Sequence, residues 1–232
     1  HHPSQTAYAL AIDFNLMPEE TMAQTTHYFV ESIHRRDNHL SVGFLGISHL
    51  LPALTKCGQN ELAFALLEQK GNPGWLYSVI NGATTIWERW NSYIAETGTF
   101  GDVSMNSFNH YAYGSIGQWL YRTVLGIQTG ENADEAGYHK IFLTPSWGGT
   151  LTYAKGEQKT PFGKIASSWE KKDNSIVYHC TIPANTTAHL TLPASGHNSV
   201  QILEGAAITD TAAVSGVADF ELVSGSYTFK IC

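Results

Sequence analysis

The stretch IVYHCTI at residues 176–182 decides the fold of the C-terminal part of the chain, because large side chains occupy every second position. Successive side chains of a strand point to opposite faces, so a period of two predicts a strand with one buried face. The same period returns in Ala188, Leu190 and Leu192 and in Tyr227, Phe229 and Ile231. Turn residues at 148–149, 161–163 and 172–174 separate such runs. Short alternating strands with frequent turns predict an antiparallel β-sandwich.

Upstream of about residue 129 the period of the large side chains is that of a helix. The clearest segment begins at Asn60, a favoured capping residue, and ends at Gly71. A second is predicted from Asn106 to Gly126, with apolar residues three and four apart. Weaker helices are predicted over 7–15, 18–35, 44–56 and 84–93, with Pro52 expected to kink or shorten the third of these.

The change of period predicts a chain of two domains, α followed by β. The polar stretch 131–137 marks the junction, so we expect a helical domain over 1–136 and the β-sandwich over 137–232. The helical part carries many large apolar residues with little charged surface between them. It therefore suits a helical layer that packs against more helices than these residues provide.

Composition excludes several classes of protein. The formal net charge is −7, from 13 basic and 20 acidic side chains, and no Lys/Arg cluster occurs, which argues against nucleic-acid binding. No apolar run approaches the roughly 20 residues of a membrane-spanning helix. The 3 cysteines form no close pair, and no metal-ligand spacing occurs, so we expect no metal and no cofactor. Nothing in the sequence assigns a compartment.

The densest chemical stretch is GATTIWERW at residues 82–90, in which Glu88 lies between Trp87 and Trp90. A carboxyl group beside indole rings is suited to general acid or base chemistry near neutral pH. Indole faces also suit the C–H-rich face of a sugar ring. A structural alternative is a helix cap, because Thr85 and Glu88 have the spacing of a capping box.

Two further residues could belong either to a sugar-binding site or to the packing of the fold. His110, predicted to lie one turn into a helix, could hydrogen-bond a sugar or could be a packing histidine. Trp75 follows a Gly-Pro-type turn and could be a stacking platform, although a tryptophan is more often part of the core.

These residues resemble one known family, the α-L-rhamnosidases of glycoside hydrolase family 78, over nearly the whole chain. The most specific motif is GATTIWERW at 82–90, followed by NHYAYG at 109–114. Further matches are QTAYAL at 5–10, GFLG at 43–46, WLY at 119–121, GKI at 163–165 with Trp169, and PANTTA at 183–188.

The resemblance implies the second half of an (α/α)6 barrel followed by a C-terminal β-sandwich. It implies hydrolysis of terminal α-L-rhamnose from glycosides or polysaccharides with inversion, which uses two carboxyl groups on opposite faces of the sugar. Glu88 falls on the general base of the family and His110 on its sugar-binding histidine. We add Trp75, Trp87 and Trp90 as expected substrate-binding residues.

One departure from the family is decisive. The general acid of the family lies in an aspartate-rich Asp-Glu-Arg segment of the first barrel half, and this sequence holds no such segment. We therefore expect an inactive piece of a longer enzyme, whose exposed barrel surface drives self-association. Two alternatives stay open: a carbohydrate-binding module without catalysis, and another (α/α)6-barrel glycosidase or phosphorylase that acts on a different sugar.

Overall fold

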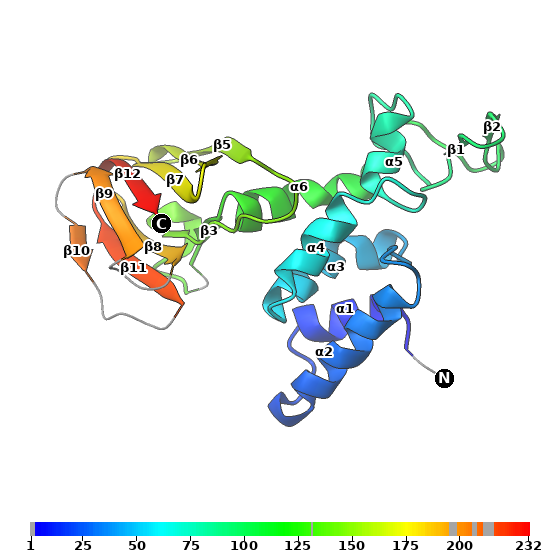
Figure 1. Cartoon of the computed structure of the whole chain (residues 1–232), viewed down its shortest axis with the longest axis horizontal. Helices are drawn as coiled ribbons and strands as arrows, with labels where there is room; N and C mark the ends of the chain where they lie inside the picture. The colour runs from blue at the N-terminus through cyan, green and yellow to red at the C-terminus, as the bar shows by residue number, and fades with distance from the viewer. Residues whose placement is uncertain (1–2, 131, 195–198, 206–207, 211–215) are drawn as a thin grey trace. The chain divides into compact units, whose positions relative to one another are not determined.

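The computed structural model describes residues 3–130, 132–194, 199–205, 208–210 and 216–232 (Figure 1). Contacts divide the chain into two compact units. The helical unit extends to Trp119 and includes Gly148–Thr150, and the β unit comprises Leu120–Trp147 and Leu151–Cys232. The predicted order, α followed by β, is confirmed. The boundary predicted between residues 136 and 137 lies inside the β unit, and as a boundary between functional domains it stays a prediction.

The helical unit consists mainly of short helices. They are α1 (Gln5–Asp13), α2 (Glu19–His34), α3 (Phe44–Lys56), α4 (Asn60–Leu67), α5 (Trp75–Ile80) and α6 (Ile116–Trp119), with a 3-10 turn at Ala112–Ser115. The first four lie where the periodicity predicts helices, and α3 continues through Pro52 to Lys56, so this proline does not shorten it. None of the described helices is long and apolar enough to cross a membrane.

Helix α3 forms the centre of this unit. Its apolar face buries Leu50, Leu51 and Leu54, and α1 packs closely against it. A Cβ on Gly46 would lie 2.6 Å from the Thr6 hydroxyl, so only glycine permits this approach of the two helices. Burying each of these leucines contributes about 1.5–3 kcal/mol relative to exposure, which makes α3 a firm support for the loops at its ends.

The structure overturns two of the helix predictions. Residues 84–92 form an irregular segment rather than a helix, and they lead into the small hairpin of β1 (Tyr93–Ile94) and β2 (Thr99–Phe100). Residues 106–111 are also irregular, because the helical run begins only at Ala112. The long-range hydrogen bonds described below outweigh the weak helical tendency of both stretches.

The β unit holds two five-stranded sheets. A π-helical turn (Leu120–Val124) precedes the strands in the chain, and a 3-10 turn (Ala136–Tyr138) lies between β3 and β4. One sheet has the order β10-β11-β8-β4-β3, from Ile208–Asp210, Val217–Leu222, Thr187–Pro193, Lys140–Leu143 and Ile127–Thr129. The other has the order β5-β6-β7-β12-β9, from Tyr153–Thr160, Gly163–Lys172, Ser175–Ile182, Gly225–Ile231 and Val200–Glu204.

The predicted strands form the core of this sandwich. Tyr178, Leu190 and Phe229 are fully buried, and the rings of Phe220 and Phe229 meet at 5.1 Å between the two sheets. The described strands pair antiparallel with one exception, since β4 pairs parallel with β8. The prediction of an antiparallel sandwich is confirmed, and the pairing of β4 with β8 is a local parallel exception within it. A parallel pair requires a long connection, and here the whole chain from β5 to β7 separates the two strands.

Candidate active site

The two irregular segments of the helical unit are joined to each other. The backbone N–H of Glu88 donates to the Ser107 carbonyl at 2.8 Å, and that of His110 donates to the Ile86 carbonyl at 2.8 Å. The Thr85 hydroxyl donates to the Phe108 carbonyl. These bonds satisfy backbone groups that a helix would otherwise satisfy, and they place Glu88 and His110 on neighbouring stretches of chain.

The carboxylate of Glu88 is held from one side. Its Oε2 accepts a hydrogen bond from the Ser107 backbone N–H at 2.7 Å, and the residue is half-buried. No described residue donates to Oε1. A carboxylate with one oxygen braced by a backbone amide and the other without a protein donor is oriented and can still accept a proton from water. Thr85 does not form the capping box with it, because no helix begins there.

His110 is fixed by its backbone and by stacking. Its ring lies parallel to that of Phe44, with centroids 4.7 Å apart and planes at 19°. Its Nδ1 accepts a hydrogen bond from the Ala112 backbone N–H at 3.3 Å. In the neutral ring the proton is therefore on Nε2, which leaves this nitrogen as a donor for a ligand oxygen.

Trp90 belongs to an aromatic cluster with Tyr113 and Trp75. It stacks on Tyr113 at 3.7 Å and 7°, and it meets Trp75 edge to face at 5.4 Å. Trp75 is 8% exposed and its indole N–H donates to the Tyr113 carbonyl, so it supports Trp90 from within the unit. Burial raises the pKa of the Tyr113 phenol, the charge of Arg89 opposes that rise, and the charge of Glu88 adds to it. Tyr113 therefore stays neutral and lies within electrostatic reach of Glu88.

Trp87 points into different surroundings. Its ring meets Phe108 edge to face at 5.5 Å, and Phe108 in turn meets Phe100. These rings border a hollow of about 330 Å³, whose remaining wall is formed by residues 81–85 and Tyr93. The structure thus brings Glu88 and His110 onto paired segments. Trp87 borders this aromatic hollow, and it also lines a small pocket of about 20 Å³ together with Trp75, Trp90 and Tyr113.

Three contributors were not singled out as site residues from the sequence. Ser107 acts through its backbone amide, which carries no signal in residue type. Phe44 and Tyr113 were named only as parts of the motifs GFLG at 43–46 and NHYAYG at 109–114. All three depend on contacts between segments far apart in sequence. No group of three or more metal-ligating side chains occurs among the described residues.

Two family models match the chain. Residues 1–124 match the bacterial alpha-L-rhamnosidase 6 hairpin glycosidase domain, and residues 126–207 match the bacterial alpha-L-rhamnosidase C-terminal domain. Two similar curated relatives are alpha-L-rhamnosidases of Streptomyces avermitilis and Formosa agariphila. The first is 40% identical over 98% of this chain, and the second 41% over 86%.

Solved structures of the same family agree with the fold. The crystal structure of Streptomyces avermitilis alpha-L-rhamnosidase complexed with L-rhamnose superposes with a TM-score of 0.90 at 39% identity, over 98% of this chain and 21% of that one. The alpha-L-rhamnosidase of Aspergillus terreus gives 0.76 at 30% identity, over 94% of this chain and 24% of that one. The chain spans 21% of the length of each of the two curated relatives.

Proposed function

Since the chain belongs to the bacterial α-L-rhamnosidase family, we propose that it supplies part of the active site of an enzyme that removes terminal α-L-rhamnose from glycosides or polysaccharides. The observation that carries this proposal is the geometry of Glu88. Its Oε2 is held by the Ser107 amide at 2.7 Å, and no described residue donates to its Oε1. Glu88 is the general base that deprotonates the attacking water.

The reaction inverts the configuration at the anomeric carbon. In an inverting enzyme, one carboxyl group activates water on one face of the sugar and a second protonates the leaving oxygen on the other face. Glu88 supplies the first of these. The second lies outside these 232 residues, so the chain by itself is inactive.

The rhamnose ring is held by His110 and the tryptophans. The Nε2–H of His110 donates to a sugar hydroxyl, because Nδ1 already accepts from Ala112. Trp90 presents apolar ring surface to the C–H groups of the sugar. Trp87 is 7% exposed and contributes through its ring contact with Phe108. Trp75 contributes through its edge contact with Trp90, which holds that ring in place.

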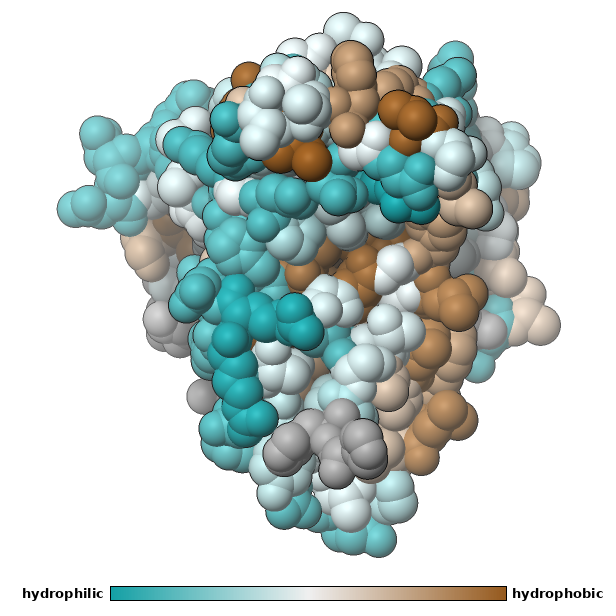
Figure 2. Space-filling model, turned by 90° about the vertical axis from the view of Figure 1, so that its right-hand side faces the viewer, coloured by the Kyte–Doolittle hydropathy of each residue, from teal (hydrophilic) through white to brown (hydrophobic). Residues whose placement is uncertain are grey.

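Apolar side chains at the surface of the helical unit support self-association of the isolated chain. Leu45, Val79, Ile80 and Tyr111 are 80%, 58%, 60% and 84% exposed. Figure 2 shows brown apolar side chains at the surface along one side of the view. Exposed apolar area of this kind marks interaction sites or drives association.

The test is hydrolysis of an aryl α-L-rhamnoside by the longer enzyme that carries this chain, with Glu88→Gln against wild type. We expect kcat to fall by several orders of magnitude, because the amide cannot take a proton from water. Glu96→Gln is the matched control, because Glu96 is an exposed carboxylate on the β1–β2 hairpin. Near-normal activity of Glu88→Gln would refute the general-base assignment. A wild-type enzyme that cleaves the glycoside of another sugar but no rhamnoside would refute the assignment of rhamnosides as its substrates.

A further inference from the structure

The outer face of the sheet β5-β6-β7-β12-β9 is mainly polar (Figure 1). Residues that lie directly opposite each other on paired strands share a face. Strand pairing therefore forms one outward row across the whole sheet, from Lys155 through Ser168, His179 and Thr228 to Glu204. Neighbouring strands lie about 4.8 Å apart, so the row spans about 19 Å. We call the outward-pointing residues of these five strands the sheet face.

Hydrogen bonds fix the middle of this row. The Thr228 hydroxyl donates to Glu204 Oε2 at 3.2 Å, and it therefore accepts the Nδ1–H of His179 at 2.8 Å. In the neutral ring the proton is thus on Nδ1, and Nε2 is an acceptor. No described residue donates to this nitrogen, and His179 is exposed. The sheet face therefore holds a hydrogen-bond acceptor in a fixed orientation.

Ser168 adds a hydroxyl beside this imidazole. It is the cross-strand partner of His179 on one side and of Lys155 on the other. Its side chain is half-buried, and its hydroxyl forms no hydrogen bond with a described residue. A cation, a hydroxyl and an imidazole acceptor therefore lie side by side within about 10 Å.

Lysines outnumber carboxylates on the sheet face, although the chain as a whole has a net charge of −7. The outward lysines are Lys155, Lys159, Lys164, Lys172 and Lys230, and the outward carboxylates are Glu157, Glu170 and Glu204. Lys164 pairs with Glu157 at 2.8 Å, and Lys172 pairs with Glu170 at 3.0 Å. In the part of the chain that the structure describes, no carboxylate forms an ion pair with the other three lysines.

The positive charge is felt along the edge strand β5. The pKa of Glu157 lies below its ordinary value, first because Lys164 donates a hydrogen bond to it and further because of the charges of Lys155 and Lys159. Lysines on an edge strand can also serve to prevent pairing with another sheet. That role alone accounts neither for Lys230, which lies on the inner strand β12, nor for the polar row on the inner strands.

The middle of the sheet face suits a saccharide better than a protein. Protein interfaces bury an apolar centre, whereas the centre here holds Ser168, His179 and Thr181. Tyr153, at the start of β5, is 68% exposed and offers an apolar ring to the C–H groups of a sugar. The hydroxyl and imidazole groups match sugar hydroxyls, and the lysines without an ion pair match carboxylates.

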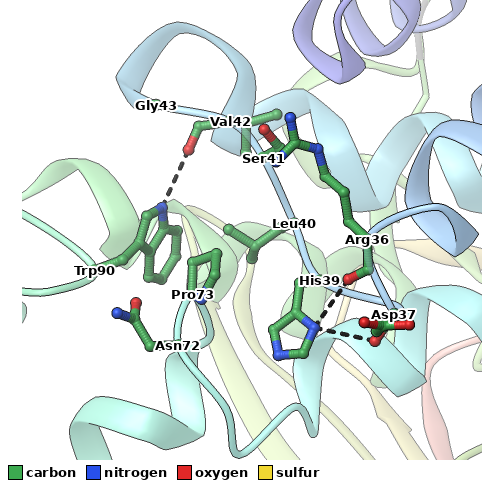
Figure 3. A pocket seen from close by; sticks show the side chains of 10 residues that line it. All are labelled: Arg36, Asp37, His39, Leu40, Ser41, Val42, Gly43, Asn72, Pro73 and Trp90. Atoms are coloured by element: carbon green, nitrogen blue, oxygen red, sulfur yellow. Dashed lines mark hydrogen bonds between the residues drawn. The ribbon is translucent and has the colours of Figure 1, made fainter.

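The sheet face is separate from the candidate active site. In the helical unit, a pocket of about 660 Å³ is lined by residues 36–43, Asn72, Pro73 and Trp90 (Figure 3). This pocket belongs to the candidate active site, because Trp90 borders both. The sheet face lies in the β unit and shares no residue with the pocket or with the groups proposed for hydrolysis.

We propose that the sheet face is a non-catalytic binding site for a polysaccharide chain that carries carboxylate groups, such as a polyuronate. Lys155 and Lys159 pair with the carboxylates of the polymer. The Ser168 hydroxyl and Nε2 of His179 bind its hydroxyl groups, and Tyr153 contacts a C–H face. This inference goes beyond the proposed function and does not depend on it, because binding requires no turnover.

The test is calorimetric titration of the longer enzyme with hexagalacturonate, and separately with maltohexaose, a neutral hexasaccharide. At low salt we expect the acidic ligand to bind about tenfold more tightly, because several exposed ion pairs add their contributions. Lys155→Gln combined with Lys159→Gln should weaken it about fivefold, and Ser168→Ala about threefold. Lys70→Gln combined with Arg122→Gln is the matched control, because it removes the same charge from exposed residues outside the sheet face.

Three results would overturn the inference. The first is hexagalacturonate that does not bind, or binds no better than maltohexaose. The second is an equal loss of affinity in the control and in the double lysine variant. The third is hexaglutamate binding as tightly and losing the same affinity in that variant, which would indicate a docking surface for an acidic protein. Aryl rhamnoside hydrolysis by the same wild-type sample tests the proposed function separately.

Discussion

The β-sandwich and residues 81–111 satisfy their backbone groups by different means. Residues 81–111 comprise the two irregular stretches and the β1–β2 hairpin between them, and are called the irregular segment below. In the sandwich, β7 pairs with β6 on one side and β12 on the other, over most of its length. In the irregular segment, the contacts are a few single hydrogen bonds, such as Glu88 to Ser107 and His110 to Ile86, and a set of ring contacts. A strand that is paired on both sides, such as β7, uses its backbone donors within the sheet, whereas the irregular segment presents the Ser107 amide to the Glu88 carboxylate.

The sandwich therefore serves mainly the stability of the fold, and the irregular segment carries the candidate catalytic groups. The sandwich buries continuous apolar faces, so its side chains contribute to folding. The irregular segment keeps Glu88 and His110 partly accessible, with polar atoms directed at neighbours or at solvent. Loops carried by a rigid support are common places for catalytic groups, and helix α3 with its buried leucines is that support here.

The largest expected effect on stability lies in the sandwich. Trp169 is 1% exposed and its indole N–H donates to the Val124 carbonyl at 2.8 Å. Trp169→Ala should reduce the free energy of unfolding by about 3–5 kcal/mol, through a cavity and an unsatisfied carbonyl. Urea unfolding followed by far-UV circular dichroism measures it. Trp90→Ala, in the other region, should cost less than about 2 kcal/mol, and equal losses would contradict the contrast between the regions.

An intermediate effect is expected where the irregular segment braces the carboxylate. Ser107→Pro removes the N–H that donates to Glu88 Oε2, whereas Ser107→Ala keeps it. In the longer enzyme, the proline variant should lower kcat for an aryl rhamnoside about 10- to 100-fold with little change in KM, because the base is misplaced. The alanine variant should retain most of the activity. If the two variants have the same kcat, the hydrogen bond from the Ser107 amide to Glu88 does not contribute to catalysis.

The smallest effect concerns Asp102, an exposed carboxyl in the irregular segment. Hydrogen bonds from the Ser104 hydroxyl and backbone N–H hold the pKa of Asp102 below its ordinary value, and Arg89 lowers it further. A depressed folded-state pKa adds stability above the ordinary carboxyl range, and this stability is lost as pH falls through the folded pKa. Ser104→Ala should raise the pKa of Asp102 part of the way back, as measured by carboxyl ¹³C NMR titration.

An internal control exists for that titration in the sandwich. A hydrogen bond from Lys164 lowers the pKa of Glu157, and Ser104 plays no part in it. Glu157 should therefore titrate unchanged in Ser104→Ala. An Asp102 that also titrates unchanged would mean that its hydroxyl partner does not stabilise the charged form.

Local pattern predicted the regular elements well. The alternation of Tyr178, Cys180 and Ile182 gave strand β7, and the spacing in residues 44–56 gave α3 with both ends correct. Each pattern records which face is buried, and burial decides these elements. The parallel pairing of β4 with β8 could not be predicted in this way, because register between distant strands leaves no local signal.

The candidate site was predicted by residue identity but not by conformation. Glu88, His110 and the tryptophans were named from their chemistry and from the family resemblance, whereas the helices expected around Glu88 and His110 are absent. Local spacing favoured a capping box at Thr85, but the pairing of 85–88 with 107–110 satisfies the same backbone groups over a longer distance.

The sequence by itself determined the order of the two parts, the faces that each regular element buries, and the residue types able to activate water and contact a sugar. These follow from periodicity and side-chain chemistry, which act over a few residues. Only the tertiary structure decided that Ser107 orients Glu88, that Phe44 stacks on His110, and that Gln5 accepts the Ser41 backbone N–H in the loop before α3. Each of these contacts joins residues at least 19 positions apart, and such closures depend on the packing of the whole helical unit.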